Sequence, residues 1–91
     1  MRDRVASMFN TIILLTGATE QPVLGDVLRR GNPLLTIRPA ATLAELDAIK
    51  PRLLQRARLV AFATTVAVPG RILKALGYGA YNFHPGPPNY P

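Results

Sequence analysis

A continuous apolar run at residues 11–16, with the sequence TIILLT, limits the possible folds more strongly than any other segment. A run without polar interruption, rich in β-branched side chains, is typical of a strand buried on both faces. Such strands occur mainly in parallel sheets that carry helices on both sides. Gly17 ends the run, so we expect a buried strand followed by a turn at residues 18–21.

Helical and strand patterns alternate along the rest of the chain. Pro22 suits a first helical turn, and apolar residues recur at helical spacing as far as Arg30. Thr42 and Glu45 match a capping box that starts a helix at Leu43. The expected elements after the first strand are a helix at 22–30, a strand at 34–37, a loop at 38–41, helical pieces from 43 and from 51, a strand at 59–63, a helix from Pro69 to Leu76 with Gly77 as its C-cap, and a strand at 80–83 closed by His84.

The order β-α-β-α-β-α-β with short connections predicts an α/β fold with a parallel sheet and helical crossovers. Ligands of such sheets bind beyond the carboxyl ends of the strands. Three segments are expected there: the turn that begins at Gly17, the loop at 64–68, and His84 with the proline-rich stretch that follows it.

Length and composition indicate one small domain. The chain has 91 residues, of which 48% are hydrophobic, and its mean hydropathy is +0.15. That value is high for a small domain with much surface, so we expect residues 1–91 to be the N-terminal part of one larger domain. The absence of cysteine excludes a disulfide framework and a zinc–thiolate site. With no apolar run of membrane-spanning length, we expect no contact with a membrane and a cytoplasmic location.

The net charge of +6 favours anionic partners such as phosphates or nucleic acid. However, the arginines are scattered, and only Arg29 and Arg30 are adjacent. A basic stripe interleaved with aromatic residues, as nucleic-acid-binding proteins carry, is missing. A nucleotide- or nucleic-acid-binding α/β module therefore stays as an alternative function.

Asn82 and His84 carry the most informative chemistry. Side chains alternate across a strand, so these two are expected on the same side of the sheet. An amide donates to a developing oxyanion, and an imidazole moves a proton near neutral pH. Together they suit acyl transfer to an amine. The alternative is that His84 is an ordinary hydrogen-bonded histidine at a strand end. His84 is the only histidine, and neither a Ser-His-Asp triad nor a metal cluster supports a catalytic role for it.

The segment 59–91 resembles the core of the 10-formyltetrahydrofolate-dependent formyltransferases. The resemblance comprises a strand, a loop, a helix led by Pro69 and an Asn-x-His-Pro strand end at residues 82–85. It implies a three-layer, Rossmann-like fold and formyl transfer from 10-formyltetrahydrofolate to an amine. Nucleic acid would be a partner only if the acceptor were an aminoacyl-tRNA. The resemblance at residues 11–30 is weaker.

The resemblance also implies roles for individual residues. Asn82 and His84 match the catalytic pair, while Val66, Ala67 and Val68 match the loop that lines the folate pocket. Gly17 and Ala18 match the turn that faces the amine substrate. The alternative for residues 66–68 is simple packing, and the alternative for Gly17 is a tight strand-to-helix turn. The family's third catalytic residue is an aspartate well beyond the Asn-x-His strand, and its loop after His-Pro differs from residues 86–89. We therefore expect little or no activity from residues 1–91 alone, and an inactive remnant is the second alternative.

Overall fold

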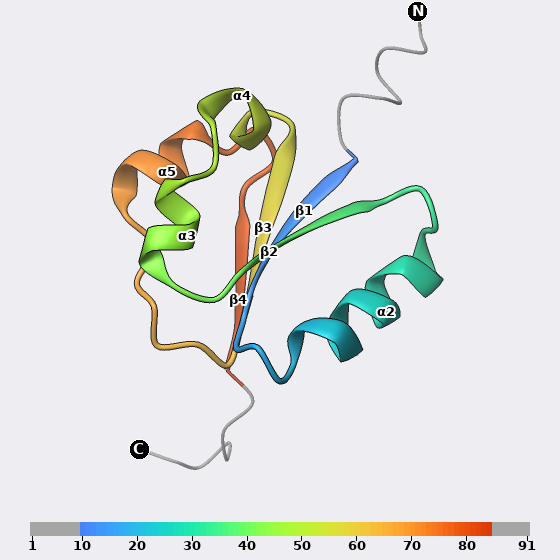
Figure 1. The fold of residues 1–91 in the computed structure, drawn as a ribbon. Coiled ribbons are helices and arrows are strands. Elements are labelled where there is room, and N and C mark those ends of the chain that lie inside the picture. Colours follow the sequence, from blue (N-terminus) through green and yellow to red (C-terminus); the bar gives the residue numbers. More distant parts are fainter. Residues whose placement is uncertain (1–9, 85–91) are drawn as a thin grey trace, which may run out of the picture.

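An all-parallel sheet of four strands organises the chain (Figure 1). The computed structural model describes residues 10–84, in which the strand order is β2-β1-β3-β4. The elements are β1 (Thr11–Leu15), α2 (Gln21–Gly31), β2 (Thr36–Ala40), α3 (Leu43–Asp47), α4 (Pro51–Leu54), β3 (Ala57–Phe62), α5 (Gly70–Ala75) and β4 (Ala80–Phe83). The predicted α/β fold with a parallel sheet and helical crossovers is confirmed.

Helices lie on both sides of the sheet. Figure 1 shows α2 on one side and α3, α4 and α5 on the other. The chain leaves the central strand β1 for β2, crosses back to β3, and continues outward to β4. The direction of winding therefore reverses between β1 and β3, and the connections that leave the carboxyl ends of these two strands run to opposite faces of the sheet.

The strand β1 is buried along its whole length, as its apolar sequence predicts. It pairs with β2 on one side and β3 on the other, with Ile13 in register with both Arg38 and Leu59. Ile13 and Leu15 pack into the core under the helices α3, α4 and α5. That core is completed by apolar residues of those helices and of β3, chiefly Leu46, Leu54, Leu59 and Ile72.

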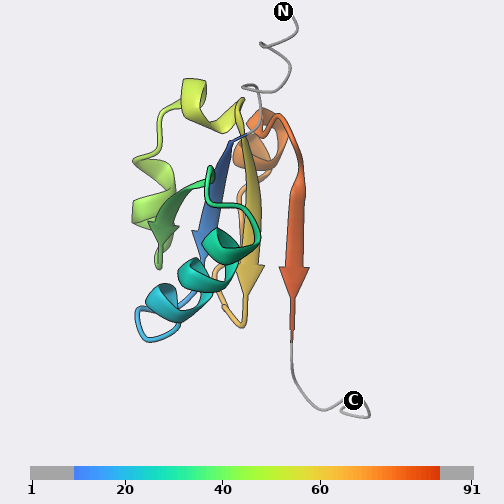
Figure 2. The same cartoon turned by 90° about the vertical axis from the view of Figure 1, so that its right-hand side faces the viewer.

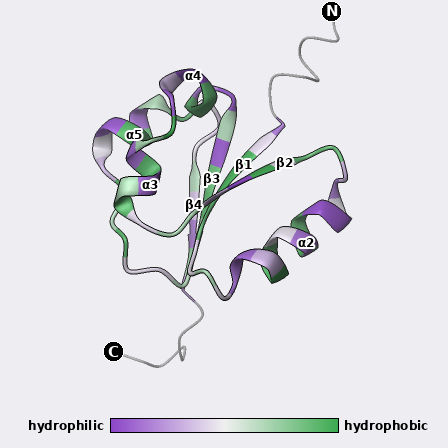
Figure 3. Ribbon diagram, viewed as in Figure 1, coloured by the Kyte–Doolittle hydropathy of each residue, from purple (hydrophilic) through white to green (hydrophobic). Residues whose placement is uncertain are grey.

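The opposite face is covered less completely. Gly25 is the buried residue of α2, whereas Val23 and Val27 are 62% and 56% exposed. Hydrophilic and hydrophobic residues alternate along α2 in Figure 3, as expected for a helix with one covered side. In Figure 2, α2 lies over the β1 and β2 side of the sheet and leaves β4 uncovered on this face.

The predicted helix starts agree with the structure. Pro22 lies in the first turn of α2, and Pro51 separates α3 from α4. The Thr42 hydroxyl accepts a hydrogen bond from the Glu45 backbone N–H at 3.1 Å, as the capping box predicts. The Glu45 carboxylate in turn accepts from the backbone N–H of Ala41. None of the helices within residues 10–84 has the length and apolar character needed to cross a bilayer.

The predicted bounds of two strands were wrong. The second strand begins at Thr36 rather than at residue 34, and it runs through the expected loop to Ala40. A turn precedes it, because Asn32 accepts from the backbone N–H groups of Leu34 and Leu35. Pairing with β1, from Thr11 opposite Thr36 to Leu15 opposite Ala40, then sets the bounds of β2. Pro39 is tolerated because β2 is an edge strand. The third strand, in contrast, begins two residues earlier than predicted, at Ala57, and ends at Phe62 rather than at residue 63.

Gly77 does not have the predicted role of C-cap of α5. Leu76 is the C-cap, and the structure places the left-handed backbone of this region at Gly79, with φ of 81°. Gly77 is instead required by a close approach between chain segments. A Cβ atom at this position would overlap the backbone carbonyl of Gln55.

Candidate functional site

The carboxyl ends of β1, β2 and β3 are joined by two side chains that sequence reasoning missed. The Thr16 hydroxyl donates to the Phe62 carbonyl at 2.7 Å, which ties the end of β1 to the end of β3. The Gln21 amide lies within hydrogen-bonding distance of the carbonyls of Leu14 (2.9 Å), Thr16 (3.2 Å) and Ala40 (3.2 Å). The available signal was a polar residue directly after a buried strand and another before Pro22. Because these bonds fix the rim of the sheet, they position the loops that leave it.

The Gly17 turn is closed by backbone hydrogen bonds. The Gly17 carbonyl accepts from the N–H groups of Glu20 and Gln21, both at 3.1 Å. Gly17 is half-buried and Ala18 is exposed. Neither residue lines the pocket that contains Asn82. The contacts of this turn are those of a tight strand-to-helix connection.

The loop after β3 is held at both ends. Ala63 has a positive φ of 51°, and its backbone N–H donates to the Phe83 carbonyl at 3.0 Å. A left-handed backbone is unusual for a residue with a Cβ atom, and such residues cluster at functional sites. The Thr64 hydroxyl accepts from the backbone N–H of Val66 at 3.1 Å. Val66 and Val68 pack against the core, so the loop has defined positions on the sheet.

A pocket of about 290 Å³, the loop pocket, lies between this loop, α5 and the strands β3 and β4. It brings together Asn82 and the three loop residues that the sequence assigned to the folate pocket. The lining residues are Leu59, Ala61, Val66, Ala67, Val68, Leu73, Ala80, Tyr81 and Asn82. An apolar hollow with one convergent amide is a common form of small-molecule site. Its volume is at the lower end of such sites, which suits one ring system rather than a large ligand.

His84 does not line this pocket. It is the first residue after β4, and both His84 and Asn82 are exposed. An amide and an imidazole are thus accessible to a ligand within two residues of each other at the end of β4. The proline-rich stretch after His84, which the sequence suggested as a ligand wall, lies outside the described residues.

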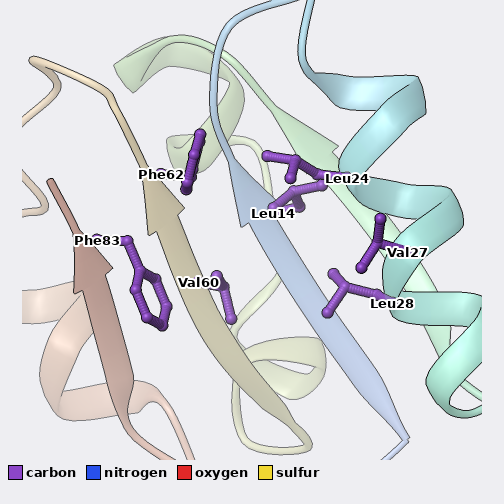
Figure 4. A pocket seen from close by; sticks show the side chains of 7 residues that line it. All are labelled: Leu14, Leu24, Val27, Leu28, Val60, Phe62 and Phe83. Carbon is purple, nitrogen blue, oxygen red and sulfur yellow. The ribbon is translucent and has the colours of Figure 1, made fainter. Parts of the chain in front are cut away.

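A second pocket, the apolar groove, lies on the other face of the sheet (Figure 4). Its volume is about 230 Å³, and its lining residues are Leu14, Leu24, Val27, Leu28, Val60, Phe62 and Phe83. Adjacent residues of a strand point to opposite faces, so Phe83 faces this groove while Asn82 faces the loop pocket. Since all seven side chains are apolar, the groove offers no side-chain group that would orient a reacting carbonyl.

The loop pocket therefore offers the Asn82 amide as a hydrogen-bond donor among mostly apolar side chains, and His84, a residue type able to transfer a proton, follows two residues later in the chain. Within residues 10–84, the histidine and acidic side chains form no group of three that would hold a metal ion. Comparison of the chain with known protein families, with curated proteins and with solved structures found no match.

Proposed function

We propose that residues 1–91 form the N-terminal part of a Rossmann-like formyltransferase domain that moves a formyl group from 10-formyltetrahydrofolate to an amine. The observation that carries this proposal is the pocket shared by Asn82 and residues 66–68. Residues 66–68 belong to the loop after β3 and Asn82 belongs to β4, and the family resemblance assigned both to one site. The parallel sheet with helices on both sides is consistent with such a domain.

In the proposed reaction, the amine attacks the formyl carbon and a tetrahedral intermediate forms. Asn82 donates a hydrogen bond to the oxygen that gains negative charge. His84 accepts the proton that the amine loses, and this proton passes to the folate nitrogen when its bond to the formyl carbon breaks. The products are the formylated amine and tetrahydrofolate, so atoms and charge balance without a metal or an oxidant.

Residues 66–68 supply the apolar wall for the folate ring in this proposal. Val66 and Val68 pack on the core, which leaves the backbone groups of the loop in fixed positions. Fixed backbone donors and acceptors recognise a flat heterocycle at little entropic cost. The pocket volume of about 290 Å³ suits the ring system of a folate, with the remainder of the molecule extending into solvent.

The test is tetrahydrofolate formation by the longest native product that contains residues 1–91, with 10-formyltetrahydrofolate and a panel of amines. His84→Ala is expected to lower the rate by about 10²-fold or more, because a positioned acid–base group contributes at least that much. His84 is exposed, so the variant is expected to keep the stability of the parent chain. Transfer at an unchanged rate in His84→Ala would remove this residue from the mechanism.

A non-catalytic folding unit is the second candidate, and the exposure of β4 favours it. All four residues of this edge strand are exposed, including Tyr81 and Phe83 at 51% each. An exposed strand edge promotes association between chains. This candidate predicts concentration-dependent association and no tetrahydrofolate formation with any amine, whereas the formyltransferase proposal predicts product.

A further inference from the structure

A basic pocket lies on the α4 side of the molecule, away from the loop pocket. It has a volume of about 330 Å³ and is lined by Lys50, Arg52, Leu53 and Arg56. Three of its four lining side chains are cationic, and none is acidic. This concentration of charge was not apparent in the sequence, because Pro51 separates Lys50 from Arg52 and residues 53–55 separate Arg52 from Arg56.

The backbone that carries these side chains is well fixed. The Lys50 carbonyl accepts from the N–H groups of Leu53 and Leu54, and the Leu53 carbonyl accepts from Arg56 at 3.0 Å. Leu54 is only 4% exposed and belongs to the core, and its carbonyl accepts from Gly77 at 3.0 Å. The residues of the basic pocket therefore belong to a segment that backbone hydrogen bonds and the buried Leu54 hold in position.

Three of the four acidic side chains within residues 10–84 are engaged elsewhere, and the fourth, Glu20, is the N-cap residue of α2 and does not line the pocket. Within residues 10–84, the recorded ion pairs join Arg29 to Asp26 and Arg71 to Asp47. The Glu45 carboxylate accepts from the Ala41 backbone as part of the helix cap. Lys50, Arg52 and Arg56 thus lack an acidic partner among the described residues, and their positive potential is available to a ligand.

We infer that this pocket binds the phosphate group of a small phosphorylated molecule or of free inorganic phosphate. Guanidinium groups form paired hydrogen bonds with phosphate oxygens, and a lysine adds a point charge. Leu53 supplies an apolar contact for the part of a ligand attached to the phosphate. In Figure 1, α4 lies at the end of the sheet where β3 begins. Asn82 is close to the carboxyl end of β4, which is parallel to β3, so the pocket on α4 lies toward the opposite end of the sheet. The inference is independent of formyl transfer.

The experiment is an NMR titration of the ¹⁵N-labelled chain with inorganic phosphate, at ionic strength held constant with chloride. Saturable shifts are expected in the amides of residues 50–56. The double variant Arg52→Gln/Arg56→Gln is expected to raise the Kd by about 10²-fold, since each of the two charge-assisted hydrogen bonds contributes roughly one order of magnitude. A parallel titration with a nucleoside monophosphate separates the two ligand sources. Tighter binding than phosphate indicates a phosphorylated molecule, and equal binding indicates free phosphate.

The matched control is Arg29→Gln/Arg30→Gln, which removes the same charge from the exposed side of α2. It is expected to leave the Kd for phosphate unchanged. Shifts at residues 50–56 that never saturate, or equal weakening by the two double variants, would overturn the inference, because diffuse attraction to a basic chain depends only on net charge. Arg52→Lys/Arg56→Lys retains the charge and is expected to lose part of the affinity through the missing paired hydrogen bonds.

Discussion

In the longest native product that contains residues 1–91, replacing Asn82 with alanine is expected to lower the kcat of formyl transfer by about 10²–10³-fold, the usual effect of removing one oxyanion donor. Asn82 lines the loop pocket together with residues 66–68, where it is the one side-chain amide. Its hydrogen bond strengthens as the carbonyl oxygen gains charge, so the effect belongs to the transition state. The KM for the formyl donor is accordingly expected to change much less than kcat.

The matched control for Asn82→Ala is Phe83→Leu. Phe83 is the next residue of β4 and lines the apolar groove on the opposite face. Its replacement alters the same strand without reaching the loop pocket, so transfer is expected to continue at the parent rate. Equal losses in the two variants would indicate damage to β4, and would argue against a chemical role for the Asn82 amide.

Gly77→Ala is expected to lower the free energy of unfolding by about 3 kcal/mol, at the upper end of the cost of overpacking. A Cβ atom at Gly77 would lie 2.7 Å from the Gln55 carbonyl carbon and would overlap its oxygen. Both neighbours are backbone atoms, which cannot rotate away as a side chain does. Two backbone hydrogen bonds also hold this segment in place. The Gly77 N–H donates to the Leu54 carbonyl, and the Tyr78 N–H donates to the Ala57 carbonyl.

Urea denaturation measures this loss, and Gly79→Ala is the control. Gly79 has φ of 81°, and an added Cβ atom there would meet nothing within 4 Å. Its replacement introduces only backbone strain, which costs about 1 kcal/mol. If Gly77→Ala cost no more than Gly79→Ala, the close approach to Gln55 would not be a constraint in solution. Since small domains are only marginally stable, the difference is large enough to measure.

The fold was predictable because local patterns and topology agree in this chain. The apolar run at 11–16 predicted the buried central strand, and Thr42 with Glu45 predicted the start of α3. The boundaries of β2 were not predictable, because pairing with β1 decides them and outweighs the local preference of Pro39 for a loop. The close contact at Gly77 joins two segments about one β-α unit apart, which no local pattern encodes.

The candidate site was predictable in part. The sheet order places β4 beside β3, so the loop after β3 and the residue Asn82 line one pocket. Gly17 and Ala18 were expected to face the amine substrate, but the Gly17 turn is hydrogen-bonded to the start of α2 and does not line the loop pocket. The hydrogen bonds of the Thr16 and Gln21 side chains were not predictable, because their acceptors are carbonyls of strands that only folding brings together.

The most direct measurement is an NMR titration of the ¹⁵N-labelled chain with a chemically stable 10-formyl folate. If the loop pocket binds the folate, the amides of Val66, Ala67 and Val68 and the side-chain amide of Asn82 are expected to show saturable shifts. The amides of Leu24 and Val60, which line the apolar groove, are expected to show none. A titration that leaves the loop pocket unchanged, or that perturbs only the apolar groove, would contradict the proposed function.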